Sequence, residues 1–190
     1  MNNASKVPGT FVFMKVGNHA GEDFESILKR KNRERERAGR IFWGYGGSVC
    51  HPLMQVQPFA RQYIKNQGGD IFLLMEPVNS KADPDIDPAK EYSSDGANWQ
   101  AIPDGIEVTG SRYALVLDEI HPVDIEISLQ DYIVGVGHSR GKVASGYVLG
   151  RVDKACLTRT NGHQQSATVP VKKCLKFSAK LLEPYAVLLR

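Results

Sequence analysis

The apolar residues of this sequence come in short runs, and the lengths of those runs constrain the fold more than any other feature. Residues 71–75 and 114–117 are uninterrupted apolar runs. A membrane-spanning helix requires roughly 20 consecutive apolar residues, so neither run is long enough to cross a bilayer as a helix. Short apolar runs bounded by turn residues are typical of buried β-strands. We therefore expect a fold built mainly from core strands.

The length and composition of the chain predict a single domain, residues 1–190, in a reducing compartment. A domain of 190 residues buries about 70% of the surface that its unfolded chain exposes. The first nine residues contain one basic residue, Lys6, and no apolar stretch, so they do not resemble a secretion signal. Cys50, Cys156 and Cys174 are an odd number of cysteines without close spacing, which argues against a disulfide framework. We expect a cytoplasmic protein with no membrane segment.

The first helix is expected to begin at Glu22. Acidic residues occupy its first turn, and Phe24, Ile27 and Leu28 follow at helical spacing. Residues 29–37 contain no apolar residue, so we expect the helix to leave the core there or to fray. The seven basic residues between positions 29 and 40 would then face water or a partner.

Strands are expected on both sides of that helix, and a second helix follows them. Residues 10–16 and 40–45 are rich in β-branched and aromatic side chains, which is typical of strands. A second helix is predicted over residues 52–66. Pro58 lies inside it, and a proline in a helix interior costs about 3 kcal/mol, so we expect a kink or a helix start near Gln57.

The rest of the chain is predicted to be mostly strand. Residues 77–103 contain four prolines and a cluster of aspartates, and we expect a loop there that contains one tight turn over 93–99. A short helix is expected to start at residues 151–154. The predicted strands are 70–75, 106–108, 113–120, 123–129, 132–137, 147–151, 169–177 and 179–189. The predicted fold class is α+β, with a β-rich mixed or antiparallel curved sheet, such as a small open barrel, and two helices in the N-terminal third.

Charge is segregated along the chain. Residues 1–69 hold eleven basic and five acidic residues, residues 70–131 hold three and fourteen, and residues 132–190 hold ten and two. If the two basic ends pack side by side, they form a positive face that attracts polyanions. The alternative interpretation is that the basic ends simply face the acidic middle of the chain.

Residues 135–142 form a glycine-rich stretch that suits an anion. Gly137 and Gly141 allow a tight turn with exposed amides, while Ser139, Arg140 and Lys142 add donors and positive charge. The glycine spacing is not that of a phosphate-binding P-loop, and Val143 stands where a metal-binding serine or threonine is needed. A basic β-turn without a ligand is the alternative interpretation.

Residues 42–48 form a second candidate, in which aromatic side chains precede a glycine turn. Alternation along a strand places Trp43 and Tyr45 on the same face, where they can stack on a base at about 1–3 kcal/mol per base. The alternative is that both rings only pack in the core.

Cys50 and His51 follow directly, but adjacent residues rarely face each other, so another histidine such as His138 would have to act as the base for a Cys50 nucleophile. A buried, inert cysteine is the more common outcome.

Together, these features predict non-catalytic binding of a phosphate-bearing ligand, either a nucleic acid or a small nucleotide, on a basic face formed by both chain ends. No cofactor or metal site is expected, because the five histidines are scattered without ligand spacing. One alternative is a cysteine-dependent enzyme that uses Cys50 with His51 or His138. The other is a protein-interaction or inhibitor module that acts through the acidic segment 76–107. The predicted ligand-binding residues are Trp43, Tyr45, Gly46, Gly47, Ser48, Gly137, His138, Ser139, Arg140, Lys142, Arg151 and Lys154.

Overall fold

A computed structural model describes residues 7–82, 87–149, 152–160 and 170–190 of the chain. The described strands belong to one nine-stranded sheet, whose main path follows the order β2-β6-β9-β3-β1-β8-β7; off this path, β4 pairs with β9 and β5 pairs with β4. Strands β1 and β3 pair in parallel, whereas the other pairings are antiparallel. The strands are β1 (Thr10–His19), β2 (Ile41–Tyr45), β3 (Phe72–Ala82), β4 (Glu91–Ser93), β5 (Gln100–Ala101), β6 (Tyr113–Ser128), β7 (Tyr132–Val134), β8 (Lys154–Arg159) and β9 (Lys172–Leu189).

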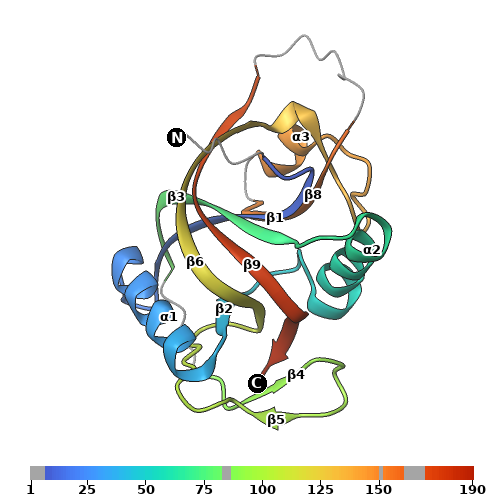
Figure 1. Cartoon of the computed structure of the whole chain (residues 1–190). Helices are drawn as coiled ribbons and strands as arrows, with labels where there is room; N and C mark the ends of the chain where they lie inside the picture. Colours follow the sequence, from blue (N-terminus) through green and yellow to red (C-terminus); the bar gives the residue numbers. More distant parts are fainter. Residues whose placement is uncertain (1–6, 83–86, 150–151, 161–169) are drawn as a thin grey trace.

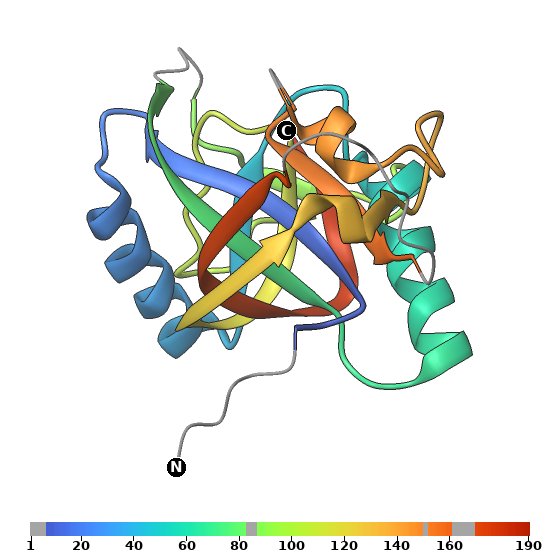
Figure 2. The ribbon, with the colours of Figure 1, turned by 90° about the horizontal axis from the view of Figure 1, so that it is seen from above.

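The sheet is strongly curved but not closed, because β2 and β7 remain at opposite ends of the strand order (Figure 1). The two longer helices, α1 (Phe24–Ala38) and α2 (Gln57–Gln67), lie on opposite sides of the molecule (Figure 2). The short helix α3 (Ala144–Val148) lies near the end at which β7 and β8 meet (Figure 1). These features confirm the predicted α+β class, the mixed curved sheet and the two helices of the N-terminal third.

Local signals at the helix ends agree with the structure. Asp23 caps α1 by accepting a hydrogen bond from the Ser26 amide at 2.9 Å, and Gly39 ends the helix in a left-handed conformation. Residues Pro52–Val56 form a π-helical turn before α2 begins at Gln57. The prediction of an irregularity or helix start near Gln57 is therefore confirmed.

Several predicted elements are wrong. Strands predicted at 113–120 and 123–129 form one continuous strand, β6, and those predicted at 169–177 and 179–189 belong to another, β9. Where breaks between strands were predicted, both strands continue, and the pairing of β6 with β9 shows irregularities in register instead of turns. Residues 106–108 are not a strand, and β3 continues to Ala82 through part of the predicted loop.

Two further errors concern the segment before β8. The predicted strand at 147–151 begins inside helix α3, and the helix start expected at 151–154 does not form, because β8 begins at Lys154. Residues 150 and 151 lie outside the described residues. Strand β8 was not predicted at all.

Both faces of the sheet are buried, as the side chains of β1 show. Val12, Met14 and Val16 belong to one hydrophobic cluster, which also includes side chains of α1 and α2. Phe11 and Phe13, on the opposite face, belong to a second cluster on the α3 side. Because successive residues of a strand point to opposite faces, a strand buried on both faces is apolar without alternation. In the described part of the chain, no helix is long and apolar enough to span a membrane.

Candidate functional site

A cavity of about 790 Å³ lies between α1, β1 and β2. It is lined by the C-terminal half of β1, by β2 and the turn that follows it, by α1, and by the segments 107–111 and 152–154. Strands β2 and β1 are four steps apart in the strand order. They reach the same cavity because the open sheet curves back on itself (Figure 2).

The two aromatic residues of β2 lie together at the cavity wall, as predicted from strand alternation. Trp43 and Tyr45 belong to the same hydrophobic cluster, whereas Phe42 points to a different one. Their exposed fractions are only 7% and 6%. The Tyr45 hydroxyl donates to the carbonyl oxygen of Cys50, and burial raises the pKa of Tyr45. Both rings are thus almost fully buried, and each contributes to the cavity lining.

A lysine and a glycine turn complete this side of the cavity. The Lys154 ammonium lies 6.0 Å from the centroid of the Tyr45 ring and 2.5 Å from a carboxylate oxygen of Asp153. A Cβ atom placed on Gly47 would lie 3.7 Å from the Lys154 Nζ atom. Gly46 and Ser48 line the same wall. The structure therefore brings together Trp43, Tyr45, Gly46, Gly47, Ser48 and Lys154 from the residues predicted by the sequence.

A buried ion pair, of which Lys31 lines the cavity, was not predicted from the sequence. The Lys31 ammonium lies 2.6 Å from a Glu34 carboxylate oxygen and donates to the carbonyl oxygens of Phe42 at 2.7 Å and Glu107 at 2.8 Å. Lys31 and Glu34 are 4% and 1% exposed. Burial lowers the pKa of Lys31 to about 8, and the neighbouring Glu34 carboxylate opposes that shift.

The rest of the predicted basic arm also differs from expectation. Helix α1 neither frays nor leaves the core within residues 29–37. Arg30 is half-buried and lies 2.6 Å from Glu22, and Arg35 pairs with Asp118. The expectation that all seven basic residues face water or a partner is therefore wrong, because Lys31 is buried and charged side chains of a helix can pack when acidic groups of the same helix or of neighbouring segments pair with them.

The glycine-rich stretch 135–142 does not line the cavity. It forms a compact turn, in which the amides of Arg140, Gly141 and Lys142 donate to the carbonyls of Gly137, Val134 and Ser139. These three amides are engaged within the turn, and a Cβ on Gly137 would meet Gln55 at 2.5 Å. His138 and Arg140 are exposed on the turn. The structure thus places Gly137, His138, Ser139, Arg140 and Lys142 apart from Trp43 and Tyr45, and Arg151 lies outside the described residues.

The residues of the enzyme alternative are engaged in other contacts. Cys50 is buried beside Cys156, whose pKa is raised by a hydrogen bond with Cys50 and by burial. The Nδ1 atom of His51 accepts a hydrogen bond from the Met54 amide at 3.3 Å and caps the π-helical turn. Each group therefore has a structural partner, and the contacts recorded for Cys50 and His51 do not bring them together as a nucleophile and its base.

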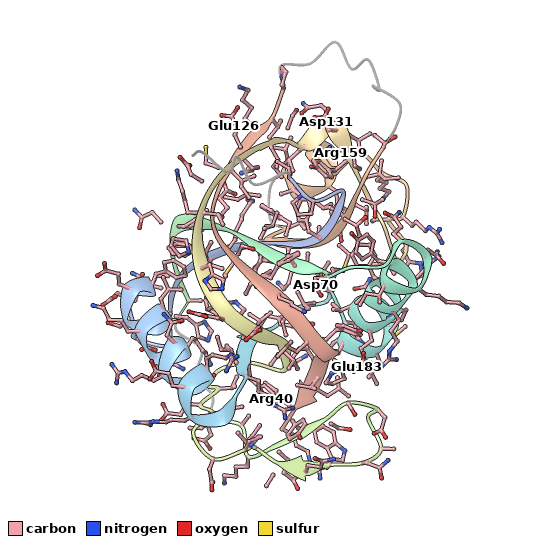
Figure 3. All side chains as sticks on the ribbon, in the orientation of Figure 1. Arg40, Asp70, Glu126, Asp131, Arg159 and Glu183 are labelled. Atoms are coloured by element: carbon pink, nitrogen blue, oxygen red, sulfur yellow. The ribbon has the colours of Figure 1, made fainter. Side chains whose placement is uncertain are left out.

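Charge along β9 is largely matched by the acidic middle of the chain. Lys172 lies 2.7 Å from Glu126, Lys176 lies 2.5 Å from Asp124, and Lys180 lies 2.7 Å from Asp70. Figure 3 shows Glu126 on β6, the strand that runs beside β9. These pairs favour the interpretation in which the basic C-terminal segment faces the acidic middle, and they leave less of its charge for a ligand.

No protein-family model matches this chain, and neither a curated protein nor a solved structure is significantly similar to it. Within the described residues, no group of three or more histidine, cysteine, aspartate or glutamate side chains is arranged to hold a metal ion.

Proposed function

We propose that this chain binds the nucleotide moiety of a phosphate-bearing ligand, without catalysing a reaction, in the cavity between α1, β1 and β2. One observation carries the proposal: the same cavity is lined by two aromatic rings, a glycine turn and a buried lysine. Ligand pockets have volumes of about 300–1,000 Å³ and combine apolar walls with a few polar groups. A cavity of about 790 Å³ lies within that range.

Each wall suits a different part of a nucleotide. Trp43 and Tyr45 offer a fixed aromatic surface to a base, and such contacts contribute about 1–3 kcal/mol per base. Gly46 and Gly47 have no side chains, so a phosphate can approach their backbone closely. The Lys154 ammonium lies near Gly47 and supplies the positive charge that a phosphate needs. Asp153 holds that ammonium in place before the ligand arrives.

Gly46 provides a clean test, because a Cβ on this residue meets no atom within 4 Å. Gly46→Glu therefore adds a bulky, negative side chain at the cavity wall, and its Cβ atom displaces no protein atom. The matched control is Gly146→Glu in α3, where a Cβ also meets no atom within 4 Å and which does not line the cavity.

The assay is the identification by mass spectrometry of any nucleotide or nucleic acid released on denaturing the purified protein, with the absorbance ratio at 260 and 280 nm as a first indicator. We expect the wild type and Gly146→Glu to release the same ligand and Gly46→Glu to release at least tenfold less. Equal release from all three proteins would refute binding in this cavity. If the wild type releases nothing and binds no nucleotide added at low salt, the proposed function is wrong.

A further inference from the structure

A second, smaller groove of about 230 Å³ lies along α1, and its lining includes Lys29, Arg33 and Arg37. These three residues are exposed, and they follow one another at a spacing of four. Because a helix rises about 1.5 Å per residue, this spacing places one cation on the same side of α1 about every 6 Å. We call these three residues the α1 stripe.

The α1 stripe differs from the other basic residues of this helix in its partners. Arg30 is engaged by Glu22, and Lys31 by Glu34. In the part of the chain that the structure describes, no carboxylate forms an ion pair with a member of the stripe. The groove is also lined by Glu22 and Glu34, which are the partners of Arg30 and Lys31, and by Glu107. The three cations of the α1 stripe therefore outnumber the one acidic side chain that is left, Glu107.

The groove and the cavity adjoin. Arg30 and Glu107 line both of them, and the Arg30 guanidinium donates to the Glu107 carbonyl at 3.1 Å. A ligand that leaves the cavity over these two residues therefore meets the α1 stripe next. Arg40, labelled in Figure 3, is exposed just beyond the end of the helix.

From this arrangement we propose that the ligand is a single-stranded nucleic acid, with one nucleotide in the cavity and its sugar–phosphate backbone along the α1 stripe. This inference rests on the proposed function. A base inside a duplex is paired and stacked, whereas the bases of a single strand can turn outward into a pocket. A positive groove beside an aromatic-lined site is the usual arrangement for binding single strands. A free nucleotide fills the cavity but does not reach the stripe.

The test compares two triple variants that change the net charge equally. Lys29→Glu, Arg33→Glu and Arg37→Glu reverse the stripe. Arg61→Glu, Lys65→Glu and Lys90→Glu reverse three exposed side chains elsewhere. Two of them are on α2, on the other side of the molecule from α1 (Figure 2). Arg61 is paired with Glu183 at 3.0 Å, but both side chains are more than half exposed, so this reversal costs little stability. Figure 3 shows Glu183 beside α2.

The probes are a fluorescein-labelled 12-nucleotide single strand of mixed sequence, as DNA and as RNA, and an equimolar mixture of nucleoside 5′-monophosphates. Anisotropy measures binding of the strands over a range of salt concentrations, and saturation-transfer NMR measures binding of the monophosphates. We expect the stripe variant to bind the strands at least about tenfold more weakly than the wild type at low salt. The slope of log K against log salt should become shallower by about 2, since each lost phosphate contact removes about 0.7. Monophosphate binding and the control variant should be unchanged.

The outcomes separate this inference from the proposed function. If the stripe variant binds strands like the wild type while Gly46→Glu does not, the backbone path along α1 is refuted and the cavity proposal stands. If only the stripe variant loses strand binding and Gly46→Glu retains it, nucleic acid binds along the helix without the cavity, which contradicts both proposals as stated. If neither probe binds the wild type, both proposals fail.

Discussion

Replacement of Lys31 by methionine is predicted to destabilise the protein by about 3–5 kcal/mol, which is the usual cost of removing one partner of a buried ion pair. The Glu34 carboxylate would remain 1% exposed without its closest cation. The carbonyl oxygens of Phe42 and Glu107 would also lose a donor. Because one ammonium joins α1, β2 and the segment before Thr109, the loss should also loosen a wall of the cavity.

The pH dependence of this variant follows from Glu34. Burial already raises the pKa of Glu34, while the Lys31 charge lowers it, so removing Lys31 should raise this pKa further. A carboxyl whose pKa is higher in the folded state binds more protons there, and its effect on stability becomes more favourable as the pH falls through that pKa. The cost of Lys31→Met should therefore be smaller at pH 5 than at pH 7.

Urea unfolding at both pH values measures these free energies. The control is Lys65→Met, which removes an exposed lysine of α2 and should change the free energy of unfolding by less than about 0.5 kcal/mol. The reasoning would be refuted if the free energy of unfolding of Lys31→Met lay within about 1 kcal/mol of the wild-type value. A cost that grows as the pH falls would also refute it.

Two further predictions concern the walls of the cavity and the thiols. Gly17→Ala should cost about 1–3 kcal/mol in thermal or urea unfolding, as overpacked sites do, because its Cβ would lie 2.3 and 2.8 Å from two oxygens of β3. Gly9→Ala, whose Cβ meets no atom within 4 Å, is the control, and equal stability of the two variants would contradict this packing. In Ellman's assay, we expect exposed Cys174 to react in the native protein and buried Cys50 and Cys156 to react only after unfolding. Rapid labelling of Cys50 would instead favour the cysteine-enzyme alternative.

Short-range patterns in the sequence predicted those features that depend on neighbouring residues. Alternation alone placed Trp43 and Tyr45 on one face, and the acidic first turn followed by apolar residues at helical spacing located α1. The same reasoning failed for Lys31 and Glu34. Their spacing of three is common on exposed helices, and only the carbonyl oxygens of β2 and of Glu107, far away in the sequence, make their burial tolerable.

The position of the cavity illustrates why the candidate site was predicted only in part. Its walls come from residues near 15, 45, 109 and 153, and their meeting depends on pairings between strands that are distant in the sequence. The β6–β9 register, for example, joins residues 113–128 to residues 172–188 with several irregularities, and such long-range register is not encoded in local periodicity. Lys154 shows the consequence. Its charge marked it as a candidate even though its secondary structure was predicted wrongly, because charge is a property of the residue itself. Its place beside Gly47 and Tyr45 instead results from the pairing of β8 with β1.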